Sequence, residues 1–269
     1  MTTYAPSIPL HRPRLAGAEL LKLRKRRGLA VTTGLLTIGA MAITSTILIA
    51  LHAANPAKHG PAGGVANLGH FVGLLSLLVP VAAILVGATA GAGDLGSGVF
   101  KELVVTGRSR LALFAARIPG GLAFLFSFVV AGYAVALVTS LAFAGSLATP
   151  SAGTAALALV WLLGVAAFFF TVALGMASLL GSRTTTIAVL LPFQLALSPI
   201  LVGISILGQS RAAFPLAAMV QLLPRSIAAN AATVKDSVAM SNVTAVLVLV
   251  AWSALALAVG AWRTTTRDA

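Results

Sequence analysis

Residues 154–181 have the sequence TAALALVWLLGVAAFFFTVALGMASLLG, which contains no Asp, Glu, Lys, Arg or His. A helix of about 20 apolar residues crosses the roughly 30 Å hydrocarbon core of a bilayer, so this run is long enough to span a membrane. Six such runs leave no residues for the exterior of a soluble core. The sequence therefore predicts an all-α membrane protein with six transmembrane helices. The other five runs are residues 29–51, 71–93, 118–144, 186–208 and 240–262.

The composition excludes the main alternatives to a membrane protein. Hydrophobic residues make up 59% of the 269 residues and charged residues only 9%, whereas a soluble domain carries about 25% charged residues. Such high hydrophobicity also excludes intrinsic disorder. The chain has no cysteine and four histidines, none of them near an acidic residue at ligand spacing. Disulfides, thiolate chemistry and a metal site are therefore not expected.

The basic residues predict the orientation of the chain. Of the 18 Lys and Arg residues, 14 fall in the N-terminal arm, in the loops after the second and fourth runs, and after the sixth run. These segments share one side of the membrane, and Lys and Arg in short loops mark the cytoplasmic side. We therefore expect both termini to be cytoplasmic, with a basic arm over residues 1–28 and a transmembrane domain over residues 29–269. Such an arm also suits anionic lipid headgroups, and no nucleic-acid partner is expected.

Two segments between the runs are unusual. The first, residues 94–110, has the sequence DLGSGVFKELVVTGRSR, and a helix over about residues 96–108 would be amphipathic. It would either lie in the lipid headgroups or dock on a partner protein. The second, residues 209–239, contains an apolar run that is too short to cross the membrane and is broken by Pro215 and Pro224. We expect it to form a re-entrant outer segment before the last span.

The residues around the first segment resemble the membrane subunits of ATP-binding-cassette (ABC) exporters of the ABC-2 family. In that family an acidic residue ends the second span, and a glycine, a short coupling helix, a small-residue turn, Ser-Arg and a later basic residue follow. Asp94, Gly98, Ser109-Arg110 and Arg117 occupy the corresponding places. Asp replaces the usual Glu, Val99 stands where Thr is common, and Thr106-Gly107 replaces Thr/Ser-Pro. We expect Pro119 to lie in the first turn of the third span.

Two further segments agree with this resemblance. Residues 18–24, AELLKLR, resemble the cytoplasmic connecting helix of the family, and Leu222-Leu223-Pro224 resembles the Leu-Pro of its re-entrant hairpin. The connecting-helix residues singled out are Glu19, Lys22 and Arg24. The residues expected to couple to the ATPase are Asp94, Gly98, Val99, Phe100, Lys101, Glu102, Leu103, Val104, Arg108, Arg110 and Arg117. An ion pair between Asp94 and Arg110 or Arg117 would fix the coupling helix, although these charges also suit independent contacts with headgroups.

The resemblance implies a permease subunit in a bacterial cytoplasmic membrane. Two copies of an ABC ATPase would bind below a pair of permease chains, which we expect to be a homodimer. ATP and Mg would bind to the ATPase, so no cofactor and no enzymatic activity are expected for this chain. This agrees with the lack of a Gly-x-x-x-x-Gly-Lys-Ser/Thr phosphate loop in the sequence.

The substrate path is predicted from polar residues within the apolar runs, namely Thr139, Thr171, Gln194 and Ser198. Each could instead form an interhelical hydrogen bond. Pro192 and Pro199 flank Gln194 and would kink the fifth span. Phe168, Phe169 and Phe170 either line a pocket for an apolar compound, face the lipid or pack between helices.

Because the six runs contain no charged residue, we expect export of an amphipathic or hydrophobic compound, such as a drug, a peptide antibiotic or a lipid-like product. Two alternatives remain at this stage. The chain could anchor or assemble an ATPase without transporting anything. It could also be an intramembrane enzyme, which the lack of an ionisable base within the runs argues against.

Overall fold

The computed structural model describes residues 12–96, 109–228 and 238–266. All regular elements in these residues are helical, and six helical segments are long and apolar enough to span a membrane. The predictions of an all-α fold and of six transmembrane helices are therefore confirmed. The spans are α2 (Arg27–Gly34), η1 (Leu35–Gly39) and α3 (Ala40–Ala54) together; α4 (Gly64–Gly96); α6 (Arg110–Ala142); α7 (Ala152–Leu180); α8 (Arg183–Pro192), η2 (Phe193–Leu197) and α9 (Ser198–Gly203) together; and α12 (Asn242–Thr266).

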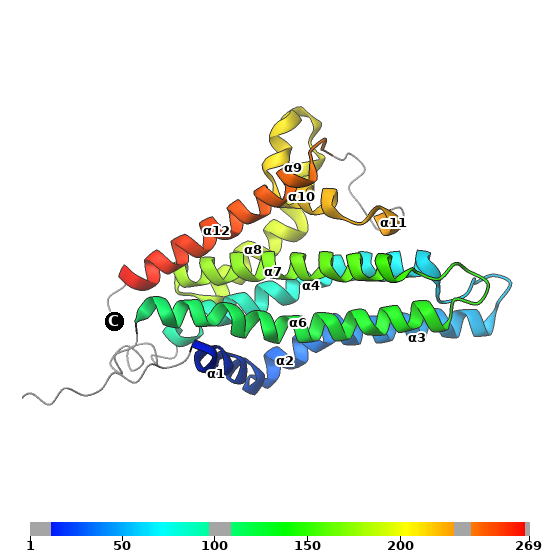
Figure 1. Ribbon diagram of the computed structural model, residues 1–269, viewed down its shortest axis with the longest axis horizontal. Coiled ribbons are helices and arrows are strands. Elements are labelled where there is room, and N and C mark those ends of the chain that lie inside the picture. Colours follow the sequence, from blue (N-terminus) through cyan, green and yellow to red (C-terminus); the bar gives the residue numbers. More distant parts are fainter. Residues whose placement is uncertain (1–11, 97–108, 229–237, 267–269) are drawn as a thin grey trace, which may run out of the picture.

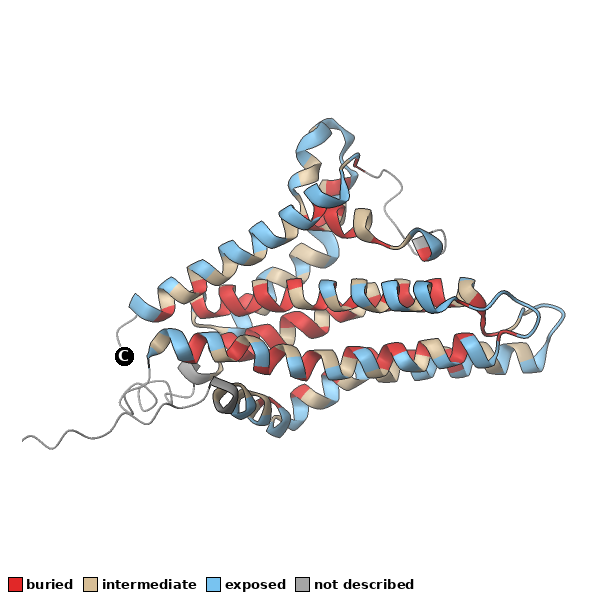
Figure 2. Ribbon diagram, in the orientation of Figure 1, coloured by how far each residue is buried: buried red, intermediate tan, exposed pale blue. Residues whose placement is uncertain are grey.

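The helices α4 and α7 run side by side through the middle of the molecule (Figure 1). The helix α6 and the segment α2–α3 lie on one side of this pair, and α8 and α12 lie on the other. Buried residues concentrate on α4, α6 and α7 (Figure 2). In the most apolar stretch of each helix, 67% of the residues of α4 are buried but only 11% of those of α12. The outer helices therefore present apolar surface outward, as helices do when lipid or another subunit surrounds them.

Local sequence explains where several helices begin and end. Ser109, Ser151 and Ser182 each precede a helix, and each hydroxyl accepts a hydrogen bond from the backbone N–H three residues later, at 3.1–3.2 Å. These contacts satisfy N–H groups that have no partner within the helix. The helix α7 ends at Gly181, whose φ of 70° is the left-handed conformation that favours glycine at a helix C-terminus.

Glycines allow the central helices to approach closely. A Cβ at Gly87 of α4 would lie 2.5 Å from the backbone oxygen of Phe170 in α7, and one at Gly91 would lie 2.6 Å from that of Leu174. The two glycines are four residues apart, on one face of the helix. Without a strong hydrophobic force between helices in lipid, such close packing supplies much of the association energy. The Gly-x-x-x-Gly face therefore sets the α4–α7 contact.

Three span boundaries differ clearly from those expected, the first being that α4 begins at Gly64 rather than near residue 71. The helix α6 begins at Arg110 rather than near residue 118, and Pro119 lies well inside it, so the prediction that Pro119 occupies the first turn was wrong. Ser109 caps the earlier start, and Arg117 lies inside the helix with a buried side chain. The fifth span ends at Gly203, since the following residues form the separate 3-10 helix η3 (Ser205–Ala213).

The segment between the fifth and sixth spans forms short helices beside the bundle (Figure 1). After η3 come α10 (Pro215–Leu222) and α11 (Arg225–Ala228). Pro215 occupies the first turn of α10, where its missing N–H is not needed. Pro224 follows soon after the end of this helix. The two prolines thus delimit the short apolar helix, and the re-entrant path of the segment stays a prediction.

Candidate functional site

The expected coupling helix lies outside the described residues, between the end of α4 and the start of α6. This applies to Gly98, Val99, Phe100, Lys101, Glu102, Leu103, Val104 and Arg108, which all fall within residues 97–108. Asp94 belongs to the end of α4, but its side chain is also outside the described part. The ion pair proposed for Asp94 therefore stays a prediction. The ends of α4 and α6, which flank this segment, are described.

Arg117 joins three helices next to that segment. Its side chain is 1% exposed, and Nη1 donates a hydrogen bond of 3.1 Å to the backbone oxygen of Gly91. Because Gly91 lies near the C-terminus of α4, its carbonyl belongs to the end of the helix that carries partial negative charge and attracts a cation. The Ser178 hydroxyl of α7 donates to Leu174 O at 2.9 Å and lies 3.4 Å from the same Gly91 oxygen. The ends of α4, α6 and α7 are thus held at one point.

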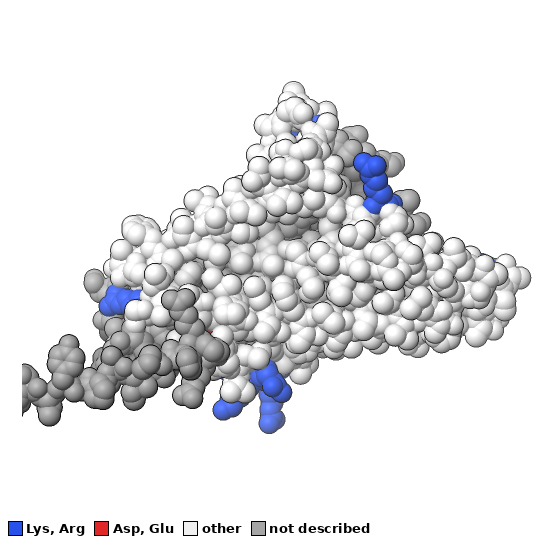
Figure 3. Space-filling view, in the orientation of Figure 1, with Lys and Arg blue, Asp and Glu red and all other residues white. Residues whose placement is uncertain are grey.

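A helix, α1 (Arg12–Lys25), is present where the connecting helix is expected, and it packs against α6. A Cβ at Gly120 of α6 would lie 2.7 Å from the Cβ of Glu19, so the glycine allows the two helices to cross closely. The Glu19 carboxylate pairs with Lys22 Nζ at 2.6 Å, whereas Arg24 is exposed. On the face that Figure 3 shows, Lys and Arg side chains lie below α1 and α2, at the end of the bundle where α12 ends, and beside α11, with uncharged surface between these places.

The same end of α6 also contacts the last span. Arg110 Nη1 donates a hydrogen bond of 3.2 Å to the backbone oxygen of Thr265, near the end of α12. The structure therefore brings Arg110 and Arg117 to one end of the bundle, where α1 and α12 also lie (Figure 1). This basic end, defined by α1 and the first turns of α6, is the described part of the expected ATPase-coupling surface.

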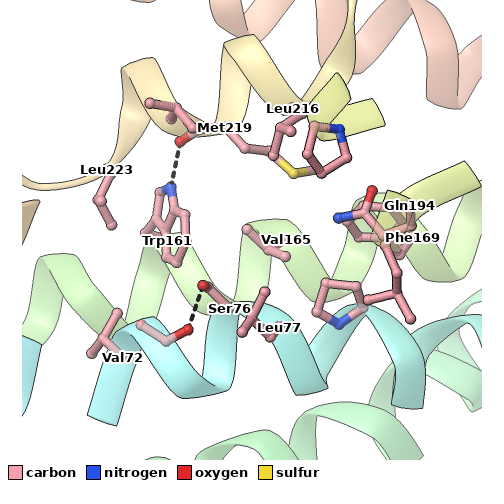
Figure 4. Close-up of a pocket in the computed structure, with 15 residues that line it drawn as sticks. Val72, Ser76, Leu77, Trp161, Val165, Phe169, Gln194, Leu216, Met219 and Leu223 are labelled. Carbon is pink, nitrogen blue, oxygen red and sulfur yellow. Dashed lines mark hydrogen bonds between the residues drawn. The ribbon is translucent and has the colours of Figure 1, made fainter. Parts of the chain in front are cut away.

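A cavity of about 190 Å³ lies within the membrane-spanning layer. Its walls come from α4, α7, the segment η2–α9 and α10 (Figure 4). The lining is mainly aliphatic and aromatic, and none of the described residues that line it is charged. The polar side chains in the lining are Ser76, Trp161 and Gln194. The cavity thus offers an apolar space with very few hydrogen-bonding groups.

Two of these three polar groups already have partners. Ser76 Oγ donates to Gly73 O at 2.6 Å, and Trp161 Nε1 donates to Met219 O at 3.0 Å. In the described part of the chain, the Gln194 amide forms no hydrogen bond, and Figure 4 draws none to it. Gln194 is half-buried, and its amide atoms are not fully enclosed. Gln194 is therefore the group in this cavity with unused hydrogen-bonding capacity.

Gln194 lies on a helical segment of unusual geometry. The segment η2 is a π-helix between two prolines, Pro192 and Pro199. Pro199 has no N–H for the carbonyl of Leu195, so an unbroken α-helical ladder cannot continue here. Single π-helical turns are rare in proteins, and those that occur are often found at functional sites. The expected interruption of the fifth span by its prolines is present, and it positions Gln194 on the cavity wall.

The other predicted path residues do not line this cavity. Thr139 Oγ1 is 2.9 Å from Ser45 Oγ and donates to Val135 O at the same distance. Thr171 Oγ1 is 2.9 Å from Phe168 O and 3.3 Å from Ser253 Oγ. Both therefore have partners in neighbouring spans. Ser198 is buried beside the cavity but is not part of its lining.

Sequence reasoning missed Trp161 and Met219, whose hydrogen bond fastens α10 to α7 over the cavity. A signal existed, because a tryptophan within a membrane span requires a partner for its indole N–H. The partner is a backbone carbonyl 58 residues away, which no local pattern identifies. Of the three consecutive phenylalanines, Phe169 lines the cavity, while Phe168 and Phe170 are buried in the core.

Comparison with known proteins gives one result that bears on identity. No curated protein matches the chain. A family model described as "ABC-2 family transporter protein" matches residues 15–269, and this range covers most of α1 and all six spans. With this match over nearly the whole chain and six helices apolar enough to span a membrane in the described residues, the protein belongs to the ABC-2 transporter family.

Proposed function

We propose that the chain is the permease subunit of an ATP-driven exporter and moves an amphipathic or hydrophobic compound outward across a bacterial cytoplasmic membrane. A separate ABC ATPase, in two copies, would bind ATP and Mg and dock at the basic end. The observation that carries this proposal is the Arg117 junction, which ties the ends of three spans together beside the expected coupling helix. A force applied to that helix would act on α4, α6 and α7 together.

Pairing with a second copy is part of the proposal. The most apolar stretches of α2–α3, α8–α9 and α12 are only 17%, 17% and 11% buried. Exposed apolar surface of this kind is compatible with lipid and with a partner subunit. Both termini and α1 would face the cytoplasm, and η3, α10 and α11 would lie toward the outer side as the re-entrant segment.

The test is coupled transport by a reconstituted complex. The full chain would be purified with its ATPase, placed in proteoliposomes and assayed for ATP-dependent movement of fluorescent amphipathic compounds. The variant Phe100→Asp places a charge on the expected apolar docking face and should abolish transport while the chain still inserts. Phe143→Asp makes the same change on an exposed turn after α6 and should transport normally.

The outcomes separate this proposal from the anchor function. ATP hydrolysis by the complex without movement of any compound would support a non-transporting anchor instead. Normal transport by Phe100→Asp would overturn the assignment of the coupling helix. Loss of transport in both phenylalanine variants would indicate a general folding defect and would also contradict the assignment of a specific docking face.

A further inference from the structure

We propose that the cavity between α4, α7, η2 and α10 binds one uncharged part of the transported compound. That part is an alkyl segment or a single aromatic ring next to a neutral carbonyl or hydroxyl group, which pairs with the Gln194 amide. This inference rests on the proposed export function and specifies the substrate class that it serves.

The size of the cavity limits what enters it. An apolar cavity of about 150 Å³ accepts benzene, whereas sites that enclose a whole drug-sized ligand measure about 300–1,000 Å³. At about 190 Å³, this cavity takes one ring or a short alkyl segment. The rest of the compound must lie outside it, toward the lipid or a neighbouring subunit.

The chemistry of the lining limits the ligand further. With no charged side chain among the described lining residues, an ionised group would lose its hydration without compensation. Ser76 and Trp161 already donate to backbone carbonyls. Gln194 remains to pair with the ligand, and an amide both donates and accepts. A single neutral hydrogen-bonding group is therefore the best match.

Specific contacts hold the walls of the cavity in place. The Trp161–Met219 bond fixes α10 against α7, and Trp252 Nε1 donates to Ala213 O at 3.0 Å, which ties the start of the α10 segment to α12. Pro80 and Pro199 on opposite walls add ring atoms that cannot change rotamer. The cavity is partly open, so a braced wall keeps it available for one part of a compound whose remainder lies outside.

Photolabelling of the purified full-length chain tests this assignment without the ATPase. The probe is an N-methyl dodecanamide with a diazirine in its alkyl chain, and labelled residues are located by mass spectrometry. We expect labelling of residues on α7 and α10 that face the cavity. A matched dodecane probe without the amide should label them about tenfold less, which corresponds to about 1.4 kcal/mol.

Two pairs of variants make the test specific. Leu195→Trp should fill the cavity and lower labelling at least about fivefold. Leu197→Trp is the control, because Leu197 lies on the same segment with similar exposure, 47% against 52%, but does not line the cavity. Gln194→Leu should reduce labelling by the amide probe to that of the alkane probe. Gln221→Leu, at a glutamine that pairs with Asn242 outside the lining, should preserve the difference between the probes.

Each outcome decides a distinct question. Labelling that is as strong in Leu195→Trp as in the unaltered chain would overturn the assignment of this cavity to cargo. A co-purified phospholipid chain that the probe does not displace would overturn it as well. Equal labelling by the two probes would overturn the role of Gln194. Specific labelling in a complex that transports no compound would leave the binding site standing and overturn the export function.

Discussion

At the scale of single residues, Arg117 supports the clearest prediction. Its guanidinium is buried and bonds to the Gly91 carbonyl, and a hydrogen bond from a charged group contributes about 1.5–3 kcal/mol. Arg117→Leu should therefore lower the melting temperature of the purified chain by several degrees and reduce ATP-driven transport. Arg117→Lys keeps the charge but loses the planar set of donors of a guanidinium. Its melting temperature should therefore lie between those of Arg117→Leu and the unaltered chain.

Arg24→Ala is the control for Arg117, because Arg24 is exposed on α1. We expect it to melt within about one degree of the unaltered chain, since surface charges contribute little to stability. An Arg117→Leu variant that melts with the unaltered chain would contradict the structural role of the Arg117 junction.

Polar residues differ in how well the sequence reveals their surroundings. Gln194 and Thr139 are both polar residues in apolar runs, and sequence alone suggested both for the substrate path. A threonine hydroxyl can bond to the carbonyl four residues earlier in its own helix, as Thr139 does with Val135. A glutamine amide cannot be satisfied as easily by its own helix. Of these two residues, Gln194 lines the cavity, and Thr139, whose hydroxyl bonds within its own helix, does not.

At the scale of elements, long apolar runs were predictable and irregular segments were not. Every predicted span corresponds to a helix, because a charge-free run of this length has few other solutions. The early start of α6 was missed because Arg110 and Arg117 suggested a loop. The cavity was missed because α10 meets α7 through a contact that is distant in the sequence. Such contacts depend on three-dimensional packing, which local periodicity does not encode.

The glycine face of α4 gives a prediction at this scale. Gly91→Ala and Gly87→Ala place a methyl group against the backbone of α7, so each should lower the melting temperature and weaken resistance to denaturing detergent. Gly164→Ala in α7 is the matched control, because nothing lies within 4 Å of its added Cβ. That variant should be neutral or slightly stabilising, since alanine favours helix by about 1 kcal/mol over glycine. Equal effects at all three positions would show that helix propensity, not close packing, determines the result.

At the scale of the whole molecule, the charge distribution and the proposed function make one joint prediction about orientation. With 14 of 18 basic residues on one side, the basic end should face the cytoplasm. Because the chain has no cysteine, single cysteines at exposed positions can be probed in intact cells with a membrane-impermeant maleimide. Ser146→Cys and Ser210→Cys should label directly, whereas Thr184→Cys and Thr266→Cys should label only after the membrane is permeabilised.

The orientation decides whether the proposed mechanism can operate. ATP is consumed in the cytoplasm, so an ATPase can reach residues 97–108 only if the adjoining ends of α4 and α6 lie on that side. Thr184 follows α7 at the same end of the bundle, where the Ser178–Gly91 contact joins α7 to α4. Direct labelling of Thr184→Cys from outside would therefore show the opposite orientation. The expected coupling helix would then lie outside the cell, where it could not meet an ATPase that uses cytoplasmic ATP. Protection of Thr184 and Thr266 together with labelling of Ser146 and Ser210 would instead place the Arg117 junction where ATP-driven motion can act on it.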